Sequence, residues 1–253
     1  MKSQWSLLGR VCSRPKCRRA DDSYRKNSEG SSRFRVNSQT NLAADLRTRG
    51  CAVCNYVINT ARDFFAQWQY ALSSTKEAQE SFAAELGFCP LHSWQLHSMS
   101  SPWGESAGLA ILAEEISNLL VKAANDDASA STLRTIPRTR KDCRVCRMLT
   151  EEESDYIGRL GSFVSDKLGR RNYERSQGVC MYHLACLLSV VSHATREFLL
   201  ATASRPFQEM AQQMRQYVAK RDALRRDLIS RDEEDAHLRV LTHLVGAKDC
   251  NRP

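Results

Sequence analysis

Apolar side chains recur at steps of three and four along much of the chain after residue 50. The first such run consists of Val57, Ala61, Phe64, Phe65, Trp68 and Leu72. This spacing places the side chains on one face of an amphipathic helix, and packing into a core is the ordinary role for them. No segment shows the strict alternation that is typical of a half-buried strand. The sequence therefore predicts an all-α protein.

The breaks in this pattern predict a helical hairpin followed by a third helix. Ser73–Thr75 interrupts the first helix, and Lys76–Leu86 forms a second one that Gly87 ends at a C-cap. A third helix should begin at Cys89, because Pro90 stands at a first helical position, where a missing N–H costs nothing. An antiparallel return of the second helix would bring Cys89 back beside Cys54.

A similar order follows later in the chain. Cys180 is expected to open a long helix whose apolar positions are Leu184, Leu187, Leu188, Val191 and Phe198. Ser204–Pro206 is expected to start another helix. Ser230 and Glu233 have the spacing of a capping box, which predicts a final helix that stops at Gly246. These last helices form a predicted C-terminal extension.

Cysteine and histidine divide the chain into two matching units. Cys51-x-x-Cys54 precedes Cys89-x-x-His92, and Cys143-x-x-Cys146 precedes Cys180-x-x-His183. The first cysteines of the two units are 92 positions apart, the third cysteines are 91 apart, and a glycine stands two residues before each third cysteine. Two patterns of four ligand-type residues with matched gaps indicate an internal repeat.

These residues have the chemistry of a structural zinc site. Three thiolates and one imidazole form a closed tetrahedral shell, and thiolates are favoured at the start of a helix. Hairpin closure predicts that each unit holds its own zinc ion. The predicted ligands are therefore Cys51, Cys54, Cys89 and His92 for one ion, and Cys143, Cys146, Cys180 and His183 for the other. A crossed arrangement, in which each ion takes one pair from each unit, is the alternative.

Charge and composition set the domain limits. The net charge is +8, but residues 1–50 contain 12 Lys/Arg and 4 Asp/Glu, so the rest of the chain is neutral overall. Residues 1–44 are polar and aperiodic, which predicts a disordered basic leader. The remaining predicted parts are a first zinc unit at 45–126, a linker at 127–140, a second zinc unit with the C-terminal helices at 141–247, and a tail at 248–253.

Other chemistry is open but less well supported by the pattern. An iron–sulfur cluster is an alternative to zinc, and so is a redox pair or a reactive metal, although no strand precedes either Cys-x-x-Cys. Cys186 is expected to be a small buried side chain, and Cys12 and Cys17 lie in the leader without a third ligand nearby. The histidines without a partner pattern are expected to be surface or core residues, namely His97, His193, His237 and His243.

The doubled Cys-x-x-Cys and Gly-x-Cys-x-x-His arrangement, with a last helix ending Leu244-Val245-Gly246, resembles an uncharacterised prokaryotic family known only as a domain of unknown function. The resemblance covers about residues 45–247. It implies an α-helical fold with two metal-ligand sets and brings no established activity.

Two functional classes follow from the sequence. The first is a non-catalytic zinc protein whose metal-clamped helices present a surface to a protein or a small molecule. The second is an iron–sulfur, redox or metal-dependent enzyme that uses one of the two ligand sets. We expect nucleic acid to bind at most weakly through the leader, because the body is neutral. No run approaches the ~20 apolar residues of a membrane span, and without an export signal a cytoplasmic location is expected.

Overall fold

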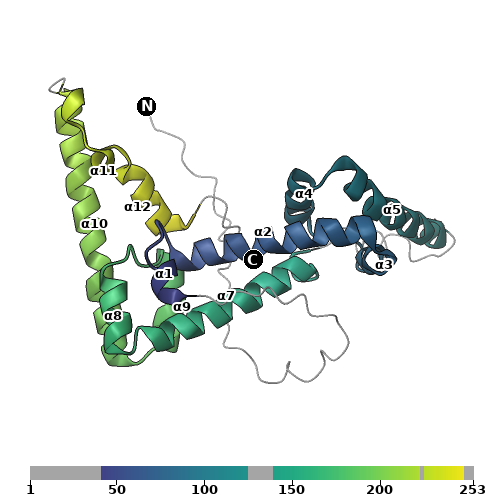
Figure 1. The fold of residues 1–253 in the computed structure, drawn as a ribbon, viewed down its shortest axis with the longest axis horizontal. Helices are drawn as coiled ribbons and strands as arrows, with labels where there is room; N and C mark the ends of the chain where they lie inside the picture. Colours follow the sequence, from purple (N-terminus) through teal and green to yellow (C-terminus); the bar gives the residue numbers. More distant parts are fainter. Residues whose placement is uncertain (1–40, 125–138, 223–224, 248–253) are drawn as a thin grey trace, which may run out of the picture. The chain divides into compact units, whose positions relative to one another are not determined.

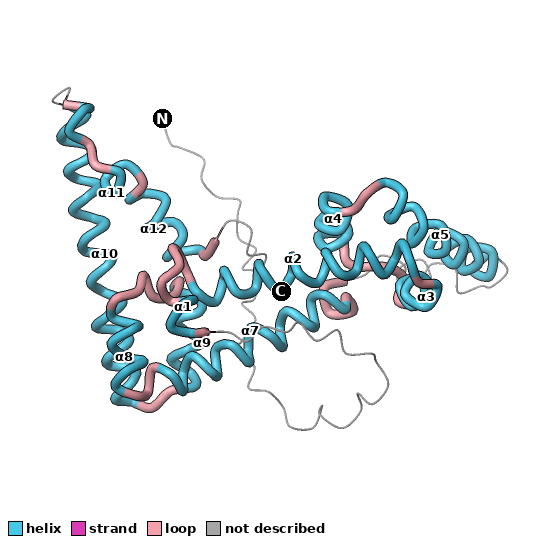
Figure 2. Tube along the Cα trace, in the orientation of Figure 1, coloured by secondary structure: helices cyan, strands magenta, loops and turns pink. Residues whose placement is uncertain are grey.

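The computed structural model describes residues 41–124, 139–222 and 225–247. Within these ranges the chain is all-α and contains no strand (Figures 1 and 2). The helices are α1 (Leu42–Asp45), α2 (Ala52–Ser74), α3 (Lys76–Ala84), α4 (Pro90–Met99), α5 (Pro102–Ala124), α7 (Arg144–Phe163), α8 (Lys167–Glu174), α9 (Met181–Val190), α10 (His193–Asp222), the 3-10 helix η2 (Arg226–Leu228), α11 (Arg231–Glu234) and α12 (Ala236–Val245).

Helix α2 follows the predicted pattern closely. It ends at Ser74, Thr75 is its C-cap, and α3 begins at the next residue, as the sequence break indicates. The apolar stripe is buried and includes Phe64, Phe65, Trp68 and Leu72. These aromatic rings pack with those of Phe82 and Phe88 at centroid separations between 5.9 and 6.4 Å. The rings of Phe82 and Phe88 are themselves 5.0 Å apart. The first hairpin therefore has its own aromatic core.

The chain after Cys89 forms two helices where the sequence predicted one. Helix α4 ends at Met99, and α5 runs from Pro102 against α2 and α3. The approach of α5 to α2 is close, since a Cβ on Gly108 would lie 2.9 Å from the Leu72 side chain. This contact explains why the chain turns at residues 100–101, because α5 buries its small residues against α2 and cannot continue the direction of α4.

The second half departs from prediction at two places. The expected continuous helix from Cys180 to Phe198 is wrong, because Val191 is an extended C-cap between α9 and α10. The expected helix start at Ser204–Pro206 is also wrong, because Pro206 lies inside α10. Proline removes one intrahelical hydrogen bond there. Leu199 and Met210 are buried on either side of it, so tertiary packing holds the helix together across this position.

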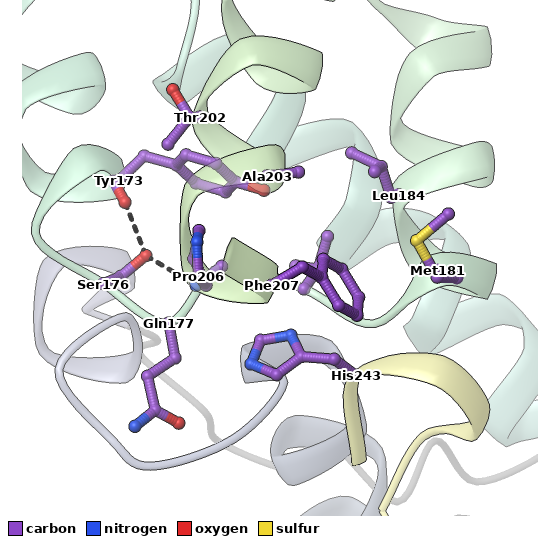
Figure 3. Close-up of a pocket in the computed structure, with 12 residues that line it drawn as sticks. Tyr173, Ser176, Gln177, Met181, Leu184, Thr202, Ala203, Pro206, Phe207 and His243 are labelled. Carbon is purple, nitrogen blue, oxygen red and sulfur yellow. Dashed lines mark hydrogen bonds between the residues drawn. The ribbon is translucent and has the colours of Figure 1, made fainter. Parts of the chain in front are cut away.

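The C-terminal extension packs back on α9 and α10. The predicted capping box is present, with reciprocal contacts between Ser230 and Glu233, and Gly246 ends α12 with a φ of +89°. Asp235 divides the expected final helix into α11 and α12. His243 of α12 lies against Phe207 of α10, with ring centroids 5.7 Å apart, at a small pocket of about 10 Å³ (Figure 3). That volume is about that of one water.

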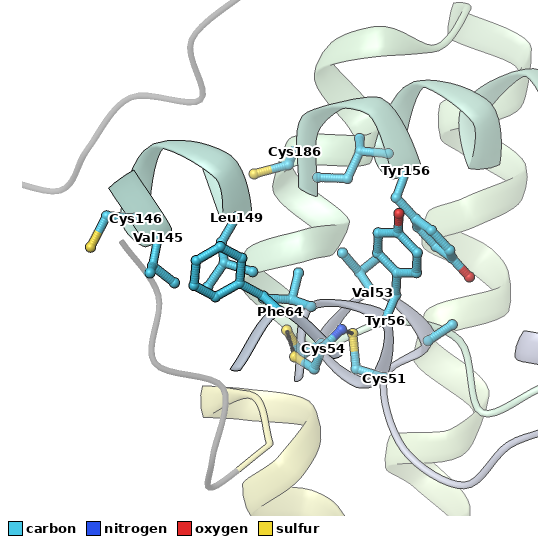
Figure 4. Packing of buried hydrophobic residues seen from close by; sticks show 14 of the residues in the cluster. Cys51, Val53, Cys54, Tyr56, Phe64, Val145, Cys146, Leu149, Tyr156 and Cys186 are labelled. Carbon is cyan, nitrogen blue, oxygen red and sulfur yellow. Dashed lines mark hydrogen bonds between the residues drawn. The ribbon is translucent and has the colours of Figure 1, made fainter. Parts of the chain in front are cut away.

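Helices α2 and α7 lie antiparallel to each other. The rings of Tyr56 and Tyr156 stack with centroids 4.5 Å apart, near the start of α2 and towards the end of α7 (Figure 4). At the other end of the pair, the Arg144 guanidinium lies 4.9 Å from the Trp68 ring centroid. The start of α2 therefore lies beside the later part of α7, and the end of α2 lies beside the start of α7. This pairing decides where the ligand residues meet.

The described helices all fall within one compact unit, residues 34–253. None of them combines the length and the apolar character needed to cross a membrane. Helix α1 begins at Leu42, just inside the predicted leader. Residues 1–40 of that leader, with Cys12 and Cys17, lie outside the described residues, as do most of the predicted linker and the predicted tail.

Candidate metal centres

Each of the four ligand pairs stands at the start of a helix. Cys51, Cys89, Cys143 and Cys180 are the N-caps of α2, α4, α7 and α9. The second member of each pair lies three residues further on, within the first helical turn. The side chains of both positions therefore point to the same region beyond the helix end. The unpaired N–H groups there favour negative charge, which suits thiolates.

Glycine shapes the approach to both Cys-x-x-His pairs. Gly87 and Gly178, each two residues before its cysteine, have φ values of +73° and +72°. A residue with a Cβ is strained in this left-handed region. The Gly87 N–H donates to the Phe82 carbonyl at 2.9 Å, which closes the end of the preceding segment. These two glycines therefore form the turns that direct the chain towards the third cysteine ligand of each unit.

The first candidate centre joins the start of α2 to the start of α9, and we call it the α2–α9 cluster. It contains Cys51, Cys54, Cys180 and His183. The Nδ1 atom of His183 lies 3.2 Å from Cys51 Sγ, 3.4 Å from Cys54 Sγ and 3.2 Å from Cys180 Sγ. The Sγ atoms of Cys54 and Cys180 are 3.9 Å apart. All four residues are buried.

The second centre joins the start of α4 to the start of α7, and we call it the α4–α7 cluster. It contains Cys89, His92, Cys143 and Cys146. The Nδ1 atom of His92 lies 3.3 Å from Cys89 Sγ, 3.4 Å from Cys143 Sγ and 3.3 Å from Cys146 Sγ. The Sγ atoms of Cys89 and Cys146 are 3.8 Å apart. These residues are buried as well.

Both sets of distances fit one tetrahedrally coordinated ion. With zinc–sulfur bonds of about 2.3 Å and a zinc–nitrogen bond of about 2.05 Å, tetrahedral angles separate sulfurs by about 3.8 Å and sulfur from nitrogen by about 3.6 Å. The observed separations lie close to these values, and the four ligand atoms of each cluster are all within 4.8 Å of one another. The sulfurs are too far apart for disulfides, whose bonds are about 2.05 Å long. Each cluster therefore has the geometry to hold a metal ion.

The predicted grouping of the ligands within each hairpin is wrong, and the crossed arrangement is found instead. Helix α2 has 23 residues and α3 has 9, so at 1.5 Å per residue the return falls short by about 20 Å. His92 consequently lies beside Phe65, in the middle of α2, with ring centroids 6.0 Å apart. The antiparallel α7 brings Cys143 and Cys146 to this level of α2, and α9 completes the other cluster.

Contacts outside the clusters hold each crossed pair of segments together. Gly50 directly precedes Cys51, and Gln177 directly precedes the turn at Gly178. The Gly50 N–H donates to Gln177 Oε1 at 2.8 Å. At the other cluster, Arg144 donates from Nε to both Glu85 carboxylate oxygens at 3.0 and 3.1 Å. Its Nη2 also donates to Ser81 Oγ at 2.7 Å. Each cluster is therefore supported by hydrogen bonds between the two chain segments that supply its ligands.

Burial makes uncompensated thiolate charge unfavourable in both clusters. Burial raises the pKa of the Cys51 and Cys89 thiols. A hydrogen bond with Cys146 lowers the pKa of Cys143 to about 3, and the same bond raises the pKa of Cys146. The two sulfurs thus share one proton. A divalent cation at this position would replace such protons and neutralise the buried thiolates.

The remaining histidine predictions are confirmed where the structure describes them, and the prediction for Cys186 holds only in part. Cys186 is buried in the core, but it is disulfide-bonded and therefore more than a small apolar side chain. His97, His193 and His237 are exposed. His243 is a core residue. Sequence reasoning missed Glu153, which contacts the α2–α9 cluster. Because Glu153 stands in the acidic run of residues 151–153, a solvated helix face was the ordinary interpretation. In the structure Glu153 is buried, whereas the other two residues of the run are not.

No protein-family model, no curated protein and no solved structure matches this chain. The functional interpretation therefore depends on the two clusters themselves.

Proposed function

We propose that this protein is a non-catalytic zinc protein in which two ions join helices from distant parts of the chain. The observation that carries the proposal is the spacing of four buried sulfur and nitrogen atoms in each cluster at tetrahedral distances. Four protein ligands of this kind fill the shell of a structural zinc ion. A catalytic zinc ion instead keeps a position open for water or substrate.

The same spacing favours a single ion over an iron–sulfur cluster. A polynuclear cluster distributes its four protein ligands over several iron atoms, so they do not all surround one point. In each cluster here, all four ligand atoms lie within 4.8 Å of one another. Here Cys89 and Cys146 have sulfurs 3.8 Å apart, and Cys54 and Cys180 have sulfurs 3.9 Å apart. Such distances suit thiolates that share one metal atom. Zinc is the common ion for a closed site with three cysteines and one histidine.

The metals would act as clamps on the helical framework. One ion would fasten α2 to α9 and the other would fasten α4 to α7, while α2 and α7 pack directly on each other. Structural zinc contributes folding free energy outright, with apparent values of about 10–16 kcal/mol in small zinc-binding peptides. Removing both ions should therefore loosen the arrangement of these four helices.

A role in presenting a surface is the second part of the proposal, and it is supported by exposed aromatic side chains. Tyr70 is 74% exposed, Trp94 is 71% exposed and Trp103 is 72% exposed, on α2, α4 and α5 respectively. His97, whose ring lies 5.6 Å from that of Trp94, contacts Glu105 at 2.9 Å and so links α4 to α5 beside Trp94. Exposed aromatic residues are enriched where proteins bind one another. We therefore favour a protein partner over a small molecule.

Metal analysis of anaerobically purified protein tests the first part directly. The expected result is a colourless protein with two zinc ions per chain, whose helical packing loosens when a strong chelator removes them. Visible absorbance with labile sulfide would identify an iron–sulfur protein and overturn the proposal. A chain that binds no metal and keeps its stability in chelator would overturn it as well.

A further inference from the structure

The histidine of the α2–α9 cluster has a buried carboxylate behind it. The Nε2 atom of His183 lies 2.6 Å from Glu153 Oε1. The His183 side chain is 0% exposed and that of Glu153 is 8% exposed. Since Nδ1 faces the three sulfurs, Nε2–H is the donor to the carboxylate. Glu153 therefore fixes the ring orientation and the tautomer that leaves the Nδ1 lone pair for a metal.

The histidine of the α4–α7 cluster has no such contact within the described residues. His92 also directs Nδ1 at three sulfurs, but its Nε2 makes no hydrogen bond to the described residues. Its ring lies 6.0 Å from that of Phe65 on α2, centroid to centroid. The two clusters thus agree in ligand type and spacing and differ in what supports the histidine.

The sequence accounts for the difference. Cys54 and Cys146 are equivalent in the two motifs and lie 92 positions apart, so the position equivalent to Glu153 is Ala61. Alanine has no side-chain acceptor. Glu153 lies on α7, seven residues or about two helical turns after Cys146. This distance along the helix takes its carboxylate away from the α4–α7 cluster and places it behind His183 of the α2–α9 cluster.

From this asymmetry we infer that Glu153 is a positioning residue that makes the two metal sites unequal, so that the α2–α9 cluster holds its ion more tightly and releases it last. The inference rests on the proposed function, because it requires a metal ion in both clusters. Hydrogen-bond partners behind metal-bound histidines typically change metal affinity about 10- to 100-fold. We expect a difference of that size between the two sites.

The primary experiment uses the intact chain loaded with cadmium and titrated with a chelator while NMR follows the two cadmium resonances. Coupling of each cadmium to the ring protons of His183 or His92 assigns its resonance. The α4–α7 resonance should disappear first, at a chelator concentration about 10- to 100-fold lower than the α2–α9 resonance. Simultaneous loss of both, or the reverse order, would overturn the inference while leaving the proposed function intact.

Variants then assign the difference to Glu153. Glu153→Leu should weaken the α2–α9 cluster about 10- to 100-fold and leave the other unchanged, whereas Glu153→Gln, which keeps an acceptor, should lose much less. Glu152→Leu is the matched control, because the neighbouring Glu152 accepts from Tyr56 Oη and not from a candidate ligand. In the metal-free chain, the imidazole nitrogen shifts of His183 should show a mixed tautomer in Glu153→Leu alone, because no metal then fixes the proton on Nε2.

A purely structural role would give a different pattern. If Glu153→Leu weakened both clusters alike, or if Glu152→Leu had the same effect, the carboxylate would be supporting α7 and not the histidine, and the inference would fail. Failure of the proposed function has its own signature, since neither cluster of the unaltered chain would then bind the ion.

Discussion

Cys54 and Cys180 are 126 positions apart in the sequence, and their Sγ atoms lie 3.9 Å apart. Each belongs to a different predicted zinc unit. Neither unit can therefore complete a four-ligand site alone, and each must supply two ligands to both clusters. Formation of the candidate metal centres consequently depends on the tertiary fold, because the ligands meet only when α2 and α7 are packed.

Separate expression of the two units should show this dependence. Residues 45–126 contain only the pairs Cys51/Cys54 and Cys89/His92, so the fragment should bind zinc weakly and without a defined ratio. Residues 138–253 should do the same. After mixing, two zinc ions per pair of fragments are expected, because both ligand sets are then complete. One tightly bound ion in each isolated fragment would favour local sites and contradict the crossed arrangement.

Replacing one histidine should remove one metal. His92→Gln is expected to lower the zinc content from two ions to one per chain and to destabilise the protein by several kcal/mol, because the α4–α7 cluster loses a ligand. His97→Gln is the matched control on the same helix, since His97 is exposed and contacts Glu105. Metal content and the thermal midpoint measure both effects. Equal losses in the two variants would argue against a ligand role for His92.

The turn before Cys180 should require glycine. Gly178→Ala places a Cβ at a φ of +72°, with the Tyr173 hydroxyl 3.3 Å away, and should cost about 1–2 kcal/mol in the free energy of unfolding. Gly158→Ala is the control, because its Cβ would meet nothing within 4 Å inside α7, and it should be neutral or stabilising by up to about 1 kcal/mol. Denaturant unfolding of both variants provides the comparison.

Acidification should loosen α12 through His243. Burial lowers the pKa of His243 below its ordinary value of 6.5, so the folded state takes up a proton less readily than the unfolded state. Its contribution to stability is complete above pH 6.5 and is lost as the pH falls through the lowered pKa. Hydrogen exchange at Ala236–Val245 should therefore speed up as the pH falls below about 6.5, beyond the intrinsic pH effect.

His243→Leu should remove that additional pH dependence, while the exposed His237→Leu should keep it. Metal content has to remain constant over the same range, since loss of zinc would also loosen the helices that α12 contacts. An unchanged pH response in His243→Leu would assign the effect to other groups.

Local patterns predicted the helices better than they predicted the packing. The boundary at Thr75, the capping box at Ser230 and the stop at Gly246 depend on neighbouring residues, and all three are confirmed. The turn at residues 100–101 and the continuity of α10 through Pro206 depend on contacts with other helices. Such tertiary contacts override local propensity and cannot be inferred from spacing alone.

The residue types of the two clusters followed from the sequence, but their pairing did not. Closing a short loop in place of a long one saves only about 1 kcal/mol, because the entropy depends on the logarithm of loop length. Packing of Tyr56 on Tyr156 and of Arg144 on Trp68 and Glu85 outweighs that preference. Glu153 escaped prediction because acidic runs on helices usually face solvent, and only the crossed pairing places it behind His183.

The crossed pairing also gives the clusters a nested order along the chain. Cys89 and Cys146 are 57 positions apart and lie within the interval of 132 positions that separates Cys51 from His183. During synthesis from the N-terminus, the inner set is complete once Cys146 has left the ribosome, and the outer set must wait for His183. Capture of the first ion would shorten the free chain between the outer ligands, so the inner ion should assist the arrival of the outer one. The first half of the polypeptide therefore has no finished site of its own until Cys146 has been made.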